Sequence, residues 1–128
     1  MNLYHYCCQH SARAITKRGF LEPFDHAGLF GVPLVWLTDS ETPDREALGL
    51  TSHIQPCDRL EFRYVVTDVD RCEPWIGSDV RNRLATVGGF DAFEAGRDPS
   101  SWWISRDRLW AVRDSSWSMV VMHGKGKP

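Results

Sequence analysis

The first stretch with residues that can do chemistry is a histidine between two tyrosines, Tyr4-His5-Tyr6, near the start of the chain. A histidine on a short aromatic strand can donate a hydrogen bond to a ribose hydroxyl, and a neighbouring aromatic ring can cover a flat heterocycle. His5 and Tyr6 are therefore candidate ligand-binding residues, and His5 is also a candidate catalytic residue. The alternative is a structural histidine that only completes the packing of a strand, since histidine has intermediate burial in proteins.

A second candidate site lies at the end of the apolar run 34–38, where Trp36-Leu37-Thr38 precedes Asp39. The run has the length and composition of a strand that is buried on both faces. Loops at strand ends form pockets, so the Trp36 ring and the Thr38 hydroxyl are suitably placed to bind a ligand. Alternatively, Thr38 and Asp39 only cap the turn that follows the strand.

A third candidate stretch contains two adjacent tryptophans, Trp102 and Trp103, shortly after Asp98. Neighbouring residues of a strand point to opposite faces, so one indole would enter the core while the other lines a groove. We interpret Trp103 as the groove-lining ring and Asp98 as the nearest carboxylate. Alternatively, both indoles serve packing, because tryptophan is mostly buried in proteins.

Motifs of several other enzyme classes are absent from the sequence, which has no glycine-rich phosphate loop, no nucleophile elbow and no metalloprotease histidine pair. Asp68, Asp70 and Glu73 could bind a hard cation, although their spacing after a strand is more typical of a solvated turn. No Cys-x-x-Cys spacing of the kind found in zinc sites occurs among the cysteines. We therefore expect no bound metal. The even number of cysteines is compatible with disulfides, but without a signal peptide we expect the reducing cytoplasm and free, buried thiols. The cysteines are Cys7, Cys8, Cys57 and Cys72.

The composition is that of a folded globular protein, with 128 residues of which 42% are apolar and 25% are charged. A net charge of −2 excludes the simplest electrostatic case for nonspecific nucleic-acid binding, but it leaves room for a local basic groove. No apolar run reaches the roughly 20 residues of a membrane span. The first residues do not resemble a secretion signal, so we expect a cytoplasmic protein without membrane association.

The chain contains six tryptophans, an unusual number for its length. We expect Trp110 and Trp117 to lie in the core of closing strands. Trp75 follows a proline in a polar stretch, so we expect its ring to be exposed.

The order of the predicted elements indicates an α+β fold. Alternation and apolar runs predict strands at 3–6, 34–38, 60–67, 102–104, 109–112 and 117–122. Start and stop signals predict helices at 11–18, with Ser11 as N-cap, at 43–48 and at 79–85, and a further helical turn at 90–95. The last third has no crossover helices, so we expect a twisted mixed or antiparallel sheet with the helices on one side. We predict a single domain over residues 1–122 and a flexible tail over 123–128.

Several of these features follow one another in an order known from one superfamily. Leu3-Tyr4-His5-Tyr6, a helix with Ala14-Ile15, Gly19-Phe20-Leu21 and then the run 34–38 resemble the opening of the ADP-ribosyltransferase superfamily. This superfamily includes DarT-like toxins and RNA 2′-phosphotransferases. The resemblance implies a split-sheet α+β fold that binds NAD, with His5 on the ribose, Tyr6 framing the nicotinamide and Thr38 beside it.

The third motif of that family departs from the pattern in this chain. The family's transferases usually carry a catalytic Glu on or just before a late strand, where the carboxylate orients a ribose hydroxyl. The matching stretch, 99–105, contains no Glu, and Asp98 is the nearest acid. The phosphotransferase branch works without this Glu and holds phosphate with arginines, for which Arg13, Arg18 and Arg97 are available.

We therefore expect a domain that binds NAD or a related nucleotide and transfers ADP-ribose to a nucleobase or a protein side chain. His5, Thr38 and Asp98 are the predicted catalytic residues. The predicted ligand contacts are His5, Tyr6, Trp36, Thr38 and Trp103. The alternative is a non-catalytic, tryptophan-rich interaction module or inhibitor that binds a macromolecular partner.

Overall fold

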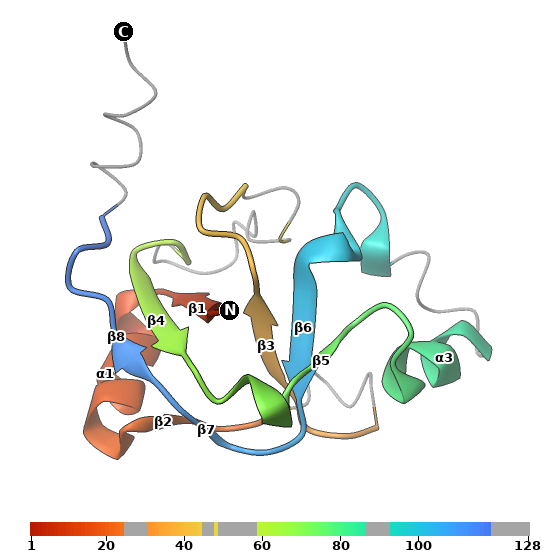
Figure 1. Ribbon diagram of the computed structural model, residues 1–128, viewed down its shortest axis with the longest axis horizontal. Helices are drawn as coiled ribbons and strands as arrows, with labels where there is room; N and C mark the ends of the chain where they lie inside the picture. Colours follow the sequence, from red (N-terminus) through yellow and green to blue (C-terminus); the bar gives the residue numbers. More distant parts are fainter. Residues whose placement is uncertain (25–30, 45–47, 49–58, 87–92, 119–128) are drawn as a thin grey trace, which may run out of the picture.

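The structure is a computed structural model that describes residues 1–24, 31–44, 48, 59–86 and 93–118. Figure 1 shows the arrangement of the helices and strands. In chain order they are β1 (Leu3–Cys7), α1 (Gln9–Arg18), β2 (Phe20–Leu21), β3 (Val35–Thr38), β4 (Phe62–Val66), η2 (Val69–Arg71), β5 (Glu73–Pro74), α3 (Asp79–Thr86), η3 (Pro99–Ser101), β6 (Trp102–Ser105), β7 (Leu109–Trp110) and β8 (Val112–Arg113).

The described strands form a six-stranded sheet in the order β5-β6-β3-β1-β4-β8 and a two-stranded sheet of β2 and β7. All of these strand pairs are antiparallel. This confirms the predicted α+β class with an antiparallel sheet, and it agrees with the absence of crossover helices in the last third of the sequence.

The central strand β1 presents different side chains to the two faces of the sheet. Leu3 and Cys7 pack with Ile15 of α1 in one core cluster. Tyr4 and Tyr6, at the alternate positions, belong to another cluster on the opposite face. This alternation is the expected result of the two-residue period of a strand.

The two described α-helices pack on opposite faces of the sheet. Ile15 of α1 belongs to a core against which Trp103 packs, whereas Leu84 of α3 belongs to a core that contains Trp102. Trp102 and Trp103 are neighbours on β6 and therefore point to opposite faces. The expectation that the helices gather on one side is thus wrong, because the alternating apolar residues of β6 give each face a core to cover.

The start of α1 also differs from the prediction. The helix begins at Gln9, and its N-cap is Cys8, which makes no side-chain capping bond. The Gln9 amide instead donates to a Glu61 carboxylate oxygen at 3.1 Å, so a residue distant in sequence replaces the local cap. Ser11 as N-cap is therefore wrong, whereas Gly19 ends the helix as predicted, in the left-handed region with φ 83°.

The pairing of β1 divides the six-stranded sheet. β1 pairs with β4 along its whole length, from Leu3 to Cys7. Its pairing with β3 is limited to one position, Tyr4 opposite Thr38. Beyond that position the two strands separate, so that β5-β6-β3 and β1-β4-β8 form two halves of the sheet.

Two expectations about tryptophan are wrong. Trp75 is completely buried, and Trp110 is 69% exposed. Trp75 enters the core because the Glu94 carboxylate accepts a hydrogen bond from its indole nitrogen. Trp110 lies on the short strand β7 and packs edge-on against Phe20, so most of its ring remains in contact with solvent.

Several predicted elements lie largely or wholly outside the described residues. These are the helix at 43–48, the turn at 90–95, and residues 119–128 of the last strand and the tail. Within the described part, Leu48, Phe93 and Glu94 are helical, and Trp117 does not belong to a strand.

Candidate functional site

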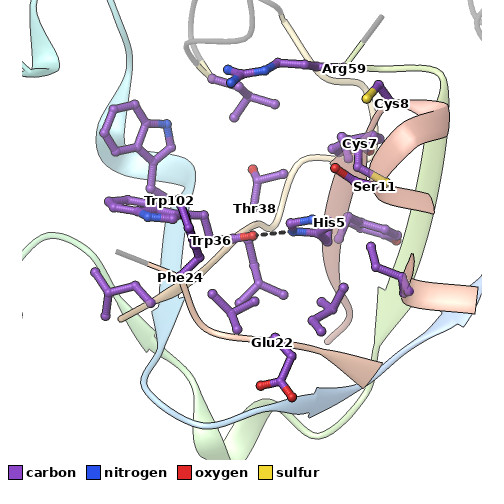
Figure 2. A pocket seen from close by; sticks show the side chains of 18 of the residues that line it. His5, Cys7, Cys8, Ser11, Glu22, Phe24, Trp36, Thr38, Arg59 and Trp102 are labelled. Atoms are coloured by element: carbon purple, nitrogen blue, oxygen red, sulfur yellow. Dashed lines mark hydrogen bonds between the residues drawn. The ribbon is translucent and has the colours of Figure 1, made fainter. Parts of the chain in front are cut away.

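A cavity of about 600 Å³ opens where β1 and β3 separate. Figure 2 looks into it, with Trp36 and Trp102 on one side and the beginning of α1 on the other. Pockets for small molecules usually have volumes of roughly 300–1,000 Å³, so this cavity has a suitable size. Predicted binding residues that line it are His5, Tyr6, Trp36 and Thr38. The structure therefore brings together side chains from the first two candidate stretches.

His5 spans the opening between the separated strands. Its Nδ1 lies 2.8 Å from the carbonyl oxygen of Trp36. A carbonyl oxygen can only accept, so Nδ1 carries the proton and Nε2 of the neutral ring is an acceptor. Among the described residues, Nε2 has no hydrogen-bond partner. Burial lowers the pKa of His5 below its ordinary value of 6.5, although the bond to Trp36 offsets part of this shift. His5 is therefore neutral at pH 7.

Thr38 supplies a buried hydroxyl to the same cavity. The residue is only 3% exposed, and its Oγ1 accepts a hydrogen bond from the Ser40 amide at 3.1 Å. Thr38 therefore caps the turn after β3, as in the alternative interpretation of this stretch. The hydroxyl proton has no acceptor within the described part of the chain, so Thr38 can also donate to a ligand.

Aromatic rings form one wall of the cavity. The centroids of Trp36 and Trp102 lie 5.8 Å apart with the rings nearly perpendicular, and Phe93 lies within 5.7 Å of both. Trp75 packs behind this wall, with its centroid 4.9 Å from that of Trp36. Perpendicular and tilted contacts of this kind are favourable and make the wall rigid.

An ion pair holds the wall in place. Arg81 donates from Nε and from a terminal nitrogen to the two oxygens of Glu94, at 2.8 and 3.1 Å. Glu94 also accepts from the Trp75 indole nitrogen at 2.6 Å. The bonds from Arg81 and Trp75 lower the pKa of Glu94, with Arg81 as the larger cause. Because Glu94 lies between Phe93 and Arg97, which both line the cavity, this ion pair fixes that segment against the sheet.

Tyr6 and Tyr4 line the cavity from β1 and are fixed from behind. The Tyr6 hydroxyl donates to the Ser40 carbonyl at 2.8 Å, and its ring meets Trp117 edge-on at 5.3 Å. The Arg63 guanidinium lies over the rings of Tyr4 and Trp117, at 4.7 and 4.6 Å. Burial raises the pKa of Tyr6, so its hydroxyl stays protonated at neutral pH. Tyr6 is therefore a fixed hydrogen-bond donor and a rigid ring of the cavity.

The charges around the cavity differ from those of the whole chain. The chain has a net charge of −2, whereas the charged residues that line the cavity within the described part are three arginines and one glutamate. These residues are Arg18, Arg59, Arg97 and Glu22. Of the arginines predicted from the sequence, Arg13 is not among the described lining residues. An excess of positive charge favours an anionic ligand.

Asp98 and Trp103 are not among the described residues that line the cavity. Asp98 is exposed and caps η3, where it accepts from the Ser100 hydroxyl at 2.6 Å and from the Ser100 amide at 3.1 Å. These bonds lower the pKa of Asp98. Trp103 points to the opposite face of the sheet and donates from its indole nitrogen to Asp39 at 3.3 Å. Its neighbour Trp102 lines the cavity instead.

Sequence reasoning also missed Arg59, Glu22 and Phe93. For Trp102, the missing information is the strand register, since Trp102 lies opposite Thr38 in the pairing of β3 with β6. For Arg59, its place directly before the alternating strand was a signal, because strand ends gather at pockets. Phe93 lies in a short helical turn and Glu22 in a loop, and neither stretch has a pattern that marks a pocket.

The cysteines differ in part from the expectation of free thiols. Cys8 is disulfide-bonded, whereas Cys7 and Cys72 are free. Cys57 lies outside the described residues. Burial raises the pKa of Cys7 to about 12 and that of Cys72 to about 11, so neither is a nucleophilic thiolate at neutral pH.

The candidate metal ligands do not assemble in the described part of the chain, which contains no group of three His, Cys, Asp or Glu residues that could hold an ion. In the acidic cluster, Asp68 instead pairs with Arg71 at 3.1 Å.

Within the residues that the structure describes, none of the helices has the length and apolar character needed to cross a membrane. Comparisons of the chain with models of protein families, with curated proteins and with solved structures find no match. The function therefore has to be inferred from the cavity itself.

Proposed function

We propose that the cavity binds NAD or a related nucleotide. The observation that carries this proposal is the neutral His5, whose Nε2 is available as an acceptor in a cavity lined by tryptophans and arginines. A nucleotide has three parts that need different surroundings. Its base stacks on aromatic rings, its ribose hydroxyls hydrogen-bond polar side chains, and its phosphates bind arginines.

The cavity offers each of these surroundings in a different place. The rings of Trp36 and Trp102 would cover the base. A ribose hydroxyl would donate to Nε2 of His5, because this nitrogen can only accept in the tautomer that bonds Trp36. The arginines would neutralise phosphate charge.

We further propose that the protein transfers ADP-ribose to a nucleobase or a protein side chain. In this reaction the bond between the ribose anomeric carbon and the nicotinamide nitrogen breaks, and its electron pair leaves with nicotinamide. The acceptor atom bonds the same carbon and releases its proton. His5 would orient the ribose for this step. Asp98 has no part in our proposal, because its carboxylate is exposed and caps η3.

Calorimetric titration of the full chain with NAD tests the binding, and detection of released nicotinamide tests the transfer. We expect His5→Ala to abolish both, because it removes the acceptor nitrogen. Asp70→Asn serves as the control, since Asp70 is exposed on η2 and is not among the described residues that line the cavity. Absence of binding by the wild-type protein would overturn the proposal. Binding without nicotinamide release, alone and with nucleic acid, would overturn only the transfer.

A second candidate function is the binding of a macromolecular partner. It is favoured by Trp110, which is 69% exposed and packs edge-on against Phe20 at 5.5 Å. Exposed tryptophans are enriched at the centres of protein interfaces. Size-exclusion chromatography with light scattering tests this candidate. A stable oligomer that Trp110→Ala dissociates, with no effect of NAD on the melting temperature, would favour it over nucleotide binding.

We also propose a cytoplasmic location, as expected from the sequence. The disulfide at Cys8 is the observation against it, because thiols are kept reduced in the cytosol. Alkylation of thiols in intact cells, followed by mass spectrometry, shows whether Cys8 is a free thiol or disulfide-bonded in the cell. An alkylated Cys8 supports the cytoplasm, and a protected Cys8 contradicts it.

A further inference from the structure

The charged groups of the cavity lie at opposite ends. In Figure 2 the Arg59 guanidinium lies at one end, beyond Thr38, and Glu22 lies at the other end, beyond His5. Glu22 pairs with Arg108 at 3.3 Å, so a positive charge already accompanies this carboxylate. The two ends therefore offer different surroundings to a ligand that has a charged part and a neutral part.

Arg18 also belongs to the Glu22 end by its position in the chain. It is the last residue of α1, and Gly19 and the two residues of β2 connect it to Glu22. Arg108 pairs with the Glu22 carboxylate, so the Arg18 guanidinium is the remaining charge at this end. Glu22 is the only carboxylate among the described residues that line the cavity, and it lies at the end away from Arg59.

Thr38 adds a directed donor beside Arg59. The hydroxyl is drawn on the side of the cavity that faces Arg59, and the residue is 3% exposed. Because Oγ1 already accepts from the Ser40 amide, the oxygen is held in place and its proton remains for a ligand acceptor. A buried hydroxyl whose proton has no acceptor within the described residues is costly, and a ligand oxygen would remove this cost.

We infer that Arg59 and Thr38 together bind a phosphate group of the ligand. This rests on the proposed function and narrows it, because a phosphate-bearing ribonucleotide would bind more tightly than a free nucleoside. A guanidinium and a hydroxyl are both donors, and phosphate oxygens are strong acceptors that accept from several donors at once. The base then lies against Trp36 and Trp102, and the ribose lies at His5.

Arg97 is the competing arginine. Its guanidinium lies over the Phe93 ring at 5.3 Å, and the residue is exposed at the edge of the aromatic wall. A guanidinium that already stacks on an aromatic ring at the solvent boundary is screened by water, so it contributes less to phosphate binding than one inside the cavity.

Calorimetry with four ligands tests the inference on the full chain. NAD and ADP-ribose carry phosphates, whereas adenosine and nicotinamide riboside do not. We expect Arg59→Gln to weaken the binding of NAD and ADP-ribose by about 10- to 100-fold, as for the loss of a charge-assisted hydrogen bond. The affinity for the two nucleosides should not change. Arg13→Gln is the matched control, because Arg13 is exposed on α1 and is not among the described lining residues.

Thr38→Val provides a second variant that conserves volume and removes the hydroxyl, with Thr67→Val in an exposed loop as its control. We expect the same selective loss for the phosphate-bearing ligands, and rescue by Thr38→Ser. Circular dichroism establishes whether each variant is folded. If Arg59→Gln unfolds, Arg59→Lys replaces it in the same titrations, because it keeps the charge but removes the planar guanidinium.

The outcomes separate this inference from the proposed function. Wild-type protein that binds none of the four ligands overturns the proposed function. Wild-type binding of NAD that Arg59→Gln and Thr38→Val leave unchanged, or equal loss for nucleosides and nucleotides, overturns only the phosphate site. The phosphate site is also overturned if Arg97→Gln, but not Arg59→Gln, selectively weakens the binding of NAD and ADP-ribose. The phosphate would then lie at the edge of the aromatic wall.

Discussion

The aromatic wall and the opening between β1 and β3 are adjacent, but their polar groups are used in opposite ways. In the wall, Glu94 accepts three hydrogen bonds from Trp75 and Arg81, so its carboxylate is saturated. In the opening, His5 uses one of its two nitrogens, and Thr38 uses its oxygen but not its proton. Saturated polar groups stabilise a fold, whereas unsaturated ones cost stability unless a ligand completes them. The comparison separates a structural region from a binding region.

The largest expected effect belongs to the core of the wall. We expect Trp75→Ala to lower the free energy of unfolding by about 3–5 kcal/mol, because the ring is completely buried and leaves a cavity. Trp110→Ala should cost about 1 kcal/mol or less, since its ring is mostly exposed. Urea denaturation of both variants measures the difference. Equal losses would show that the buried ring of Trp75 contributes no more to stability than the exposed ring of Trp110.

Removal of the saturated carboxylate should have the next largest effect. We expect Glu94→Ala to lower the free energy of unfolding by about 2–3 kcal/mol, because Arg81 and the Trp75 indole lose a shared acceptor. Asp98→Ala removes a carboxylate that is exposed, and its effect should be much smaller. If the two variants denature at the same urea concentration, the ion pair does not hold the wall.

A smaller loss of stability is expected in the opening. His5→Gln removes the imidazole bond to the Trp36 carbonyl, and we expect a loss of about 1 kcal/mol or less. The same variant should lose binding of NAD, because Nε2 is no longer available. Thermal melting with and without NAD measures both effects. A large loss of stability would indicate that His5 is a structural histidine, and the distinction between the two regions would then fail.

The two regions should also respond to different ranges of pH, which is the smallest effect. The pKa of His5 is lowered from 6.5, so the unfolded chain takes up a proton that the folded chain does not, and stability falls as pH decreases below 6.5. The pKa of Glu94 is lowered from 4.5, so its contribution is complete above 4.5 and is lost at lower pH. Urea denaturation at several pH values measures both. His5→Gln should remove only the pH dependence of stability that begins below 6.5, and Glu94→Ala only the one that begins below 4.5.

Much of the architecture could be predicted from the sequence, because alternation and stop signals act locally. The strand around His5, the end of α1 at Gly19 and the antiparallel sheet are examples. His5, Tyr6, Trp36 and Thr38 also line one cavity, since two short stretches carry them.

The remaining features depend on contacts between distant residues. Trp102 rather than Trp103 lines the cavity because of the register between β3 and β6, which adjacent tryptophans cannot reveal. The burial of Trp75 depends on Glu94, which follows it by 19 residues. The cap of α1 comes from Glu61, 52 residues away. Such pairs leave no local pattern.

The single pairing of Tyr4 with Thr38 also has a mechanical consequence. Continuous hydrogen-bonded sheets resist relative movement of their strands, whereas here β1 and β3 pair at one position. The other bonds between the two halves come from side chains, such as those of His5 and Tyr6. Each half can therefore tilt about that junction without breaking its own backbone bonds. A ligand in the cavity would bridge the two halves and restrict the tilt, so that occupancy would be transmitted to both edges of the sheet, at β5 and at β8.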